Sequence, residues 1–188
     1  MSTALQLRRG TTAQHASFTG ALGEISVDTD KKVVVVHDGA TAGGTPLAKQ
    51  VGGSLTDQLV NGMREPITVS ATAATGTINF DQVTQSILYY TTNASANWTL
   101  NIRGNSGTTL NSRMAIGETL TVTFMVTQGA TAYYQTALQV DGSAITPKWQ
   151  GGSAPTSGNA SGIDAYNFAI IKTANATFTV LASLTQFK

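Results

Sequence analysis

Apolar and polar residues alternate with a period of two in several short segments of the chain. The segment 98–103, WTLNIR, places Trp98, Leu100 and Ile102 on one face and polar side chains on the other. The segment 119–128, TLTVTFMVTQ, repeats this pattern. Period-two alternation is typical of a strand that buries one face. Both segments therefore predict half-buried β-strands.

Further strands are predicted where β-branched and aromatic residues gather between turn signals. These segments read SILYYTT, TAYYQTALQVD, AITPKWQ, AYNFAIIK and ATFTVLAS, and stretches such as RGNSG, QGAT and GGSAPTSGNASG separate them. Strands at this spacing are typical of a sandwich or a jelly roll. We predict an all-β fold in which residues 66–188 form a jelly-roll-like β-sandwich domain. The polar run 152–160 is expected to be an exposed loop that can be shortened.

One segment departs from the period of two. From Ser54 onward, apolar residues recur every four positions, at Leu55, Leu59 and Met63, and an acidic residue follows Ser54 three positions later. This pattern predicts a capped helix. Residues 50–65 are therefore expected to form a short helical linker, which packs on an adjacent module or meets two other copies at an axis.

The first 49 residues contain four consecutive valines, at 33–36, after the alternating segment GEISVDT and the turn-like DTDKK. The two segments predict a β-hairpin. A strand without alternation is typically covered on both faces, and so short a module supplies little chain for two covering layers. The cover comes from the second module or from neighbouring copies. The predicted trimer interface consists of Ile25, Val27, Val33, Val34, Val35 and Val36.

A resemblance bears on this module. Residues 10–48, GTTAQHASFTGALGEISVDTDKKVVVVHDGATAGGTPLA, closely resemble the N-terminal module of the phage major tropism determinant family, trimeric receptor-binding proteins of tail-fibre tips. The resemblance implies that residues 1–49 form a β-prism in which three chains wrap one axis, for assembly or anchoring. More loosely, the pattern RRGT…GE…DTD…DG…PL is similar to modules at the N-termini of many phage fibre and appendage proteins.

Downstream of Pro66 the resemblance changes. No counterpart of the family's C-type lectin domain is apparent there, so its receptor-contacting residues are not transferred to this chain. The segment YQTALQVDGSAITPKWQGGSAPTSGNASGID and the terminal FTVLAS are similar to β-rich C-terminal domains of structural proteins in phages of marine bacteria. This similarity implies a virion protein without locating a site.

Composition excludes several classes of function. The chain has 188 residues, a net charge of +1 and only 11% charged residues, so it lacks the basic patch of a nucleic-acid-binding protein. It has no apolar run near the roughly 20 residues of a membrane-spanning helix, and its first residues lack the apolar core of a signal peptide. It contains no cysteine, which excludes disulfides, thiol catalysis and thiolate metal sites.

Candidate metal ligands are few. His15 and His37 are the two histidines, and they either form a metal pair or fill packing and surface roles, which we favour. DTDKK begins like a calcium loop but lacks its glycine and its closing glutamate, so an Asx-type turn is expected instead. We predict no metal and no cofactor.

Catalysis is not expected either. Two of the four scattered acids Asp81, Glu118, Asp141 and Asp164 would suffice for a glycosidase, but isolated acids are most often surface charges or turn caps. No G-x-S-x-G elbow is present. Four aromatic residues near polar loops either pack in the core or stack on sugar rings; these candidate surface-recognition residues are Tyr133, Tyr134, Trp149 and Tyr166.

The leading hypothesis is a structural virion protein of a bacteriophage, a short homotrimeric tail fibre or fibre-like appendage, assembled in the host cytoplasm. It docks through residues 1–49 and displays residues 66–188. Its expected partners are its own copies, other virion proteins of the tail or capsid, and a host surface glycan or protein, without nucleic acid or membrane insertion. The alternatives are a capsid-decoration or head-fibre protein, a host-glycan-binding adhesin and, as a minor one, an enzyme acting on surface polysaccharide.

Overall fold

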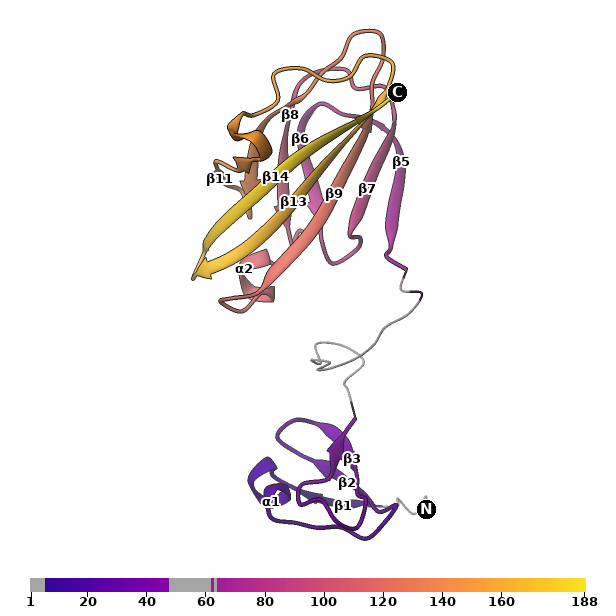
Figure 1. The fold of residues 1–188 in the computed structure, drawn as a ribbon, viewed down its shortest axis with the longest axis vertical. Helices are drawn as coiled ribbons and strands as arrows, with labels where there is room; N and C mark the ends of the chain where they lie inside the picture. The colour runs from indigo at the N-terminus through magenta and orange to yellow at the C-terminus, as the bar shows by residue number, and fades with distance from the viewer. Residues whose placement is uncertain (1–5, 48–61, 63) are drawn as a thin grey trace. The chain divides into compact units, whose positions relative to one another are not determined.

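A computed structural model describes residues 6–47, 62 and 64–188 (Figure 1). The chain divides into two compact units, Met1–Gly62 and Met63–Lys188, which are treated separately below. Strands dominate and helices are few, which confirms the predicted all-β fold. The helix predicted from Ser54 onward lies outside the described residues. Within the described part, no helix is long and apolar enough to cross a membrane.

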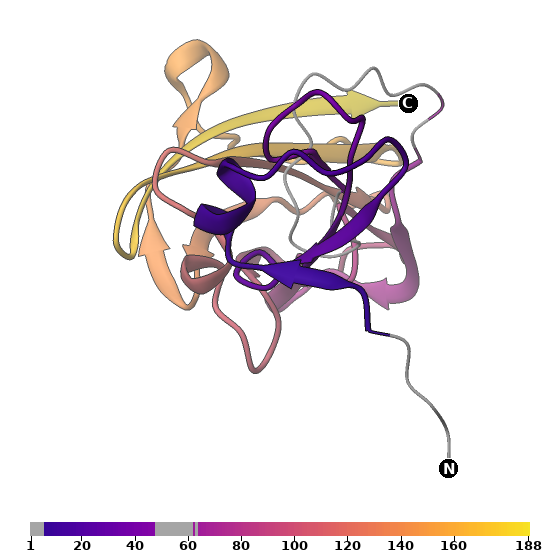
Figure 2. The same cartoon turned by 90° about the horizontal axis from the view of Figure 1, so that it is seen from below.

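The N-terminal unit is a small four-stranded sheet with one short helix, seen from below in Figure 2. Its elements are β1 (Arg8–Gly10), α1 (Thr12–Ala16), β2 (Ile25–Asp28), β3 (Val33–Val36) and β4 (Thr45–Pro46). The strand order is β1-β2-β3-β4, with β1 parallel to β2 and the other pairs antiparallel. The hairpin predicted around DTDKK is therefore confirmed.

A capping box starts α1. The Thr11 side chain accepts from the Gln14 N–H, and the Gln14 side chain accepts from the Thr11 N–H at 2.8 Å. Two N–H groups that a helix start leaves unpaired are thereby satisfied. The helix is only five residues long and lies next to β1 in sequence, so its place in the unit depends on packing more than on intrinsic stability.

The C-terminal unit contains two sheets (Figure 1). The six-stranded sheet has the order β12-β14-β13-β9-β7-β5, and the four-stranded sheet has the order β11-β10-β8-β6. The elements are β5 (Ile67–Ala73), β6 (Gly76–Asp81), β7 (Ile87–Thr92), β8 (Trp98–Arg103), α2 (Leu110–Arg113), β9 (Thr119–Thr127), β10 (Gln135–Val140), β11 (Ser143–Ile145), β12 (Lys148–Trp149), a 3₁₀ turn (Gln150–Gly152), β13 (Ile163–Ala174) and β14 (Thr177–Phe187).

From β5 to β10 the chain changes sheet at every connection. As a result β5, β7 and β9 pair in parallel in one sheet, and β6, β8 and β10 pair in parallel in the other. The segment from β5 to β10 therefore passes back and forth between the two sheets, with its strands in each sheet running in the same direction. The antiparallel pairs β10–β11 and β13–β14 then extend the two sheets. Jelly rolls are antiparallel. This topology does not support the jelly-roll-like part of the prediction, because alternation within one strand carries no information about strand direction.

One hydrophobic core lies between the two sheets. The alternation predicted for 98–103 and 119–128 is confirmed, since the apolar faces of β8 and β9 are buried. Trp98 is the largest fully buried side chain, and its ring meets those of Phe124 and Tyr166 edge to face at centroid distances of 5.9 and 5.7 Å. Such aromatic contacts supply much of the packing energy of a core.

Two charged side chains hold the short helix α2 beside this core. At its start, the Asp141 carboxylate accepts from the N–H groups of Leu110 and Asn111 at 2.7 and 2.9 Å. At its end, the buried Lys172 ammonium donates to the carbonyls of Asn111 and Met114 at 2.6 and 2.8 Å. Each charge is paired with a backbone group that the helix end leaves free.

Candidate functional site

The N-terminal sheet has two chemically different faces. On one face, Ile25 pairs with Val36 and Val27 pairs with Val34 across β2 and β3. Ile25, Val34 and Val36 are 45%, 37% and 37% exposed, and Leu47, just beyond β4, is 51% exposed. We call these five residues the N-terminal apolar face. An exposed apolar surface of this kind is a candidate interaction site.

The opposite, inner face of the sheet is covered within the unit itself. Ser26 pairs with Val35, and Asp28 pairs with Val33. Val35 is only 1% exposed, and a Cβ at Gly44 would lie 2.8 Å from its Cγ1. Gly44 has φ +61°, a conformation that glycine adopts without strain. A close backbone approach therefore covers this face, with no second copy needed.

These two faces explain the four valines and correct the predicted interface. Val34 and Val36 point to the exposed face, whereas Val33 and Val35 point to the inner face. The prediction that all four contact other copies is wrong for Val35, which is buried inside its own unit, and Val33 lies on the same inner face. The four valines are therefore apolar for two different reasons. Val33 and Val35 lie on the face that the unit covers itself, whereas Val34 and Val36 lie on the face that is open to a partner.

A polar cluster lies behind the inner face. His15 and His37 are 6% and 1% exposed, and their rings stack with centroids 6.2 Å apart. The Ser26 hydroxyl lies between them, 2.9 Å from His15 Nε2 and 2.8 Å from His37 Nε2. Within the described ranges, no group of three or more His, Cys, Asp or Glu side chains could hold a metal ion. The two histidines take the packing role that the sequence favoured.

The contacts of His15 determine which groups of this cluster donate and which accept hydrogen bonds. A carbonyl only accepts, so His15 Nδ1, 3.0 Å from the Thr11 oxygen, carries the proton. With the His15 proton on Nδ1, the Ser26 hydroxyl donates to His15 Nε2, and His37 Nε2 donates to the same hydroxyl. His37 Nδ1 is buried without a hydrogen-bond partner in the described part of the chain.

Replacing Ser26 with alanine is expected to destabilise the N-terminal unit by about 2 kcal/mol or more, because it leaves two buried imidazole nitrogens unpaired. Both tryptophans lie in the C-terminal unit, so amide hydrogen exchange of β2 and β3 is the suitable measurement. Ser17→Ala is the matched control, since the exposed Ser17 hydroxyl makes only a long 3.5 Å contact. Equal exchange in the two variants would contradict a structural role for the cluster.

Asp28 fixes the turn between β2 and β3, as the Asx-type prediction required. Its Oδ1 accepts from the N–H groups of Asp30 and Lys31, both at 3.0 Å, and its Oδ2 accepts from the Thr12 hydroxyl at 2.8 Å. The hydrogen bond from Lys31, together with those from Thr12 and Asp30, lowers the pKa of Asp28. The Thr41 hydroxyl and N–H lower the pKa of Asp38 in the same way.

These shifts predict acid sensitivity of the N-terminal unit. A carboxylate whose folded-state pKa is lowered stabilises the fold above its ordinary value, here 3.8, and this contribution is lost as the pH falls through the folded-state pKa. The urea midpoint of the β2 and β3 amide signals in NMR should fall between about pH 5 and about pH 3. Asp28→Asn should reduce that difference, and an unchanged midpoint in the wild type would contradict it.

The four candidate recognition aromatics do not form an exposed stacking surface. Tyr166 is 0% exposed, so its predicted surface role is wrong; burial raises its pKa. Trp149 is half-buried, and its ring packs against Tyr166 at 6.4 Å and Phe168 at 6.2 Å. Tyr133 and Tyr134 are half-buried, and Tyr133 packs against the core. The core-packing interpretation holds for Tyr166, Trp149 and Tyr133.

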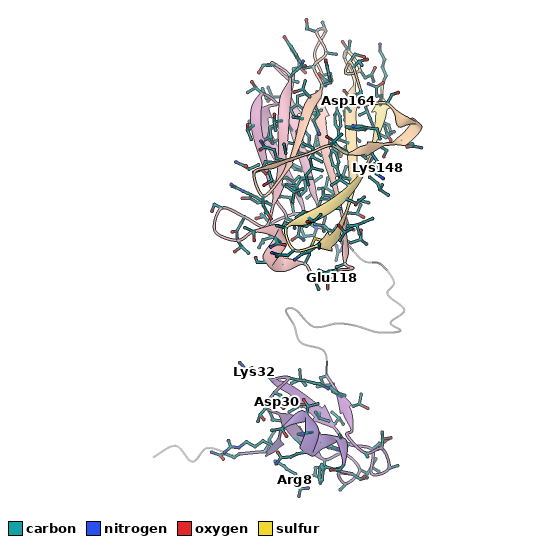
Figure 3. The ribbon with its side chains drawn as sticks, turned by 90° about the vertical axis from the view of Figure 1, so that its left-hand side faces the viewer. Arg8, Asp30, Lys32, Glu118, Lys148 and Asp164 are labelled. Carbon is teal, nitrogen blue, oxygen red and sulfur yellow. The ribbon has the colours of Figure 1, made fainter. Side chains whose placement is uncertain are left out.

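The four acids considered for catalysis each hold local structure. Asp164 and Glu118 lie at opposite ends of the C-terminal unit in Figure 3. The Asp81 carboxylate accepts from Arg103 at 2.7 Å, the Glu118 carboxylate accepts from the Ala115 N–H at 2.8 Å, and Asp141 holds the start of α2. Glu118 and Asp141 thus cap turns or helix starts, as the sequence favoured, and Asp81 forms an ion pair.

Asp164 anchors the long loop before β13. It is 0% exposed, and its Oδ2 accepts from Gln128 Nε2 at 3.0 Å and from the Asn159 N–H at 3.1 Å. A Cβ at Gly158 would lie 2.3 Å from the Tyr133 carbonyl oxygen. The expectation that residues 152–160 can be shortened without loss is therefore corrected: positions 158 and 159 are built into the structure, and the exposed residues lie before them.

Gly158→Ala is expected to destabilise the C-terminal unit by about 1–3 kcal/mol, because the added methyl forces the loop away from Tyr133 and Asp164. Ser157→Ala, at the exposed neighbouring position, should change stability by less than about 0.5 kcal/mol. Urea unfolding followed by tryptophan fluorescence measures both. Equal midpoints would show that the loop is not held at Gly158.

Comparison with known proteins concerns the N-terminal residues. Residues 5–41 match the family described as the Major tropism determinant N-terminal domain. A tail fiber receptor-binding protein of Bordetella phage BPP-1 is 78% identical over 49 residues, which are 26% of this chain and 13% of that protein. Solved structures of the Major Tropism Determinant I1 and U1 variants are 76% identical over 24% of this chain and 12% of theirs, with TM-scores of 0.24.

The chain thus spans about an eighth of the length of the curated relative it matches. The expected resemblance of the residues from Pro66 onward to marine phage structural proteins stays a prediction. What the comparisons establish is that the N-terminal segment is similar, at high identity, to the corresponding part of a phage tail fibre receptor-binding protein.

Proposed function

We propose that this chain is a virion protein of a bacteriophage, a short homotrimeric tail fibre or fibre-like appendage. Its N-terminal unit trimerises and docks on the particle, and its C-terminal unit is displayed outward. One observation carries the proposal: the segment that is 78% identical to a tail fibre protein is the one that exposes the N-terminal apolar face.

Self-association explains why this face is apolar. Burying one valine, isoleucine or leucine side chain contributes roughly 1.5–3 kcal/mol, and the face offers five of them per copy. The inner face of the N-terminal sheet is already covered within the unit, so only the N-terminal apolar face is available to a partner. Three copies around an axis, as in the β-prism that the sequence resemblance implies, would bury all three faces together.

The C-terminal unit fits a displayed structural domain. The four acids weighed for catalysis are engaged in structural contacts, and the four aromatic candidates do not share an exposed surface. The structural roles of these four acids support the proposal that the chain is not an enzyme. A host-glycan adhesin is not favoured by a specific feature of the described residues, whereas attachment to the capsid in place of the tail remains the alternative location.

Immunoelectron microscopy of virions tests the proposal. An epitope tag placed within residues 153–156 lies in the exposed first part of the loop, before the anchored Gly158. We expect gold label at the tail of intact particles, with untagged virions as the control. Label on the capsid would favour a decoration or head-fibre protein. Particles without label, from cells that contain the tagged protein, would contradict a virion role.

A further inference from the structure

The outer face of the six-stranded sheet in the C-terminal unit is also apolar. Across β5 and β7, Ile67 pairs with Ile87 and Val69 pairs with Tyr89, and Tyr89 in turn pairs with Met125 on β9. These residues alternate with buried Leu88 and Phe124, so they point away from the core. Ile67 and Val69 are 48% and 60% exposed. We call these five residues the C-terminal apolar face.

The surroundings of this face carry no charge along the same two rows of the sheet. The row through Ile67 and Ile87 continues with Thr123, Asn167 and Ser183, and the row through Val69, Tyr89 and Met125 continues with Ala165 and Thr185. The Thr123 hydroxyl donates to Asn167 at 2.8 Å, and the Thr127 hydroxyl donates to the Tyr89 oxygen at 3.2 Å. The Thr123 and Thr127 hydroxyls beside the apolar residues therefore already have partners within the sheet.

The outer face of the four-stranded sheet is built differently. Here Thr77 pairs with Thr99, Asn79 with Asn101, and Asp81 with Arg103 across β6 and β8. Asn101 donates to Asn79 at 2.9 Å, and Arg103 donates to Asp81 at 2.7 Å. Such a ladder of polar and charged pairs is what a water-facing sheet surface carries. The same unit thus has one outer face suited to water and one suited to a partner.

We propose that the C-terminal apolar face docks against the C-terminal unit of a second copy of this chain within the oligomer. This inference rests on the proposed trimer. An uncharged face meets its own copy without like-charge repulsion, whereas the Asp81 and Arg103 face would have to give up its contact with water. A protein partner of opposite charge has nothing to recognise on these rows.

The size of the face indicates that tethering is required. The five residues lie on three strands about 4.8 Å apart, and their two rows of side chains give roughly 200 Å² per copy. A standard interface between free proteins buries about 800 Å² per partner, so the face is too small to hold untethered copies. Nineteen residues lie between Leu47 and Ile67, so these two residues can be at most about 70 Å apart. Copies joined at the N-terminal apolar face are therefore held at a high local concentration.

Cysteine protection in the full chain tests this docking. The chain contains no cysteine, so Val69→Cys and Thr77→Cys each carry a single thiol. Both positions are exposed in one copy, on the outer faces of the two different sheets. In the trimer, we expect the thiol at position 69 to react with a maleimide about tenfold more slowly than the thiol at position 77. Tryptophan fluorescence confirms that both variants are folded.

A third variant identifies what covers the face. Adding Val34→Asp to Val69→Cys separates the copies and should restore fast labelling. Equal rates at positions 69 and 77 in a trimer would overturn the docking and leave the proposed function standing. Protection that survives in the separated chains would also overturn it, because the cover would then come from the same chain. A wild type that is monomeric would overturn the trimer and the docking together.

Discussion

If the chain forms the proposed trimer, replacing Val34 with aspartate is expected to convert it into monomers. Val34 lies in the middle of the N-terminal apolar face, opposite Val27 on β2 and two positions from Val36. In the trimer its side chain would be buried, and each copy would then place an unpaired carboxylate in an apolar interface. A buried unpaired charge costs several kcal/mol, and the cost recurs in all three copies. Sedimentation velocity at a fixed protein concentration measures the outcome.

Leu22→Asp is the matched control. Leu22 is apolar and 84% exposed in the same unit, but it lies in the connection between α1 and β2, outside the face. The control should therefore remain a trimer. Val35→Asp would not test the interface, because Val35 is buried inside the unit and the change would unfold it. A Val34→Asp protein that sediments like the wild type would show that the face does not join copies.

The second large effect is expected from Trp98→Ala, which should destabilise the C-terminal unit by about 3–5 kcal/mol. The indole is 1% exposed and packs against Phe124 and Tyr166, so its removal leaves a cavity between the sheets. Trp149 remains as the fluorescent probe of urea unfolding. Because the N-terminal unit is separate, its β2 and β3 amides should keep their hydrogen-exchange protection.

Trp149→Ala serves as the comparison for this loss. Trp149 is half-buried in the short strand β12 at the edge of the six-stranded sheet, so its removal should cost less than that of Trp98. Similar losses for the two variants would contradict the central place of Trp98 in the core. Loss of protection in both units of Trp98→Ala would show that they do not fold separately.

Alternation in the sequence predicted the strands in which apolar and polar side chains alternate clearly. Segments 98–103 and 119–128 became β8 and β9 with the expected faces inward. The same period of two was visible at Tyr166 in the sequence. Tyr166 shares a strand face with Phe168 and Ile170 and is buried with them. Its assignment as a surface candidate came from the neighbouring polar loop and ignored that period.

Features that depend on tertiary contacts could not be predicted in this way. β5, ITVSATA, is rich in threonine and alanine, and β6 has only two apolar residues, Ile78 and Phe80, so neither strand offers a long alternation to detect. Parallel pairing depends on where each connection crosses, and alternation is the same for either strand direction. The Ser26 contact to His15 and His37, and the Asp164 contact to Asn159, join residues whose distance in space is set by the fold.

For the four valines, the structure supports part of what the sequence pattern predicted. Four apolar residues in sequence indicated covers on both faces of a strand, and the structure supplies one of them within the unit at Val35. The other cover, over Val34 and Val36, is the part that the proposed trimer would provide.

Mass in solution tests this account most directly. Sedimentation equilibrium of the full chain should give three times the 19.5 kDa mass of a single chain, with no dissociation at micromolar concentration. A stable species at the mass of one chain, with the N-terminal unit folded, would leave the apolar face without its partner and would contradict the account.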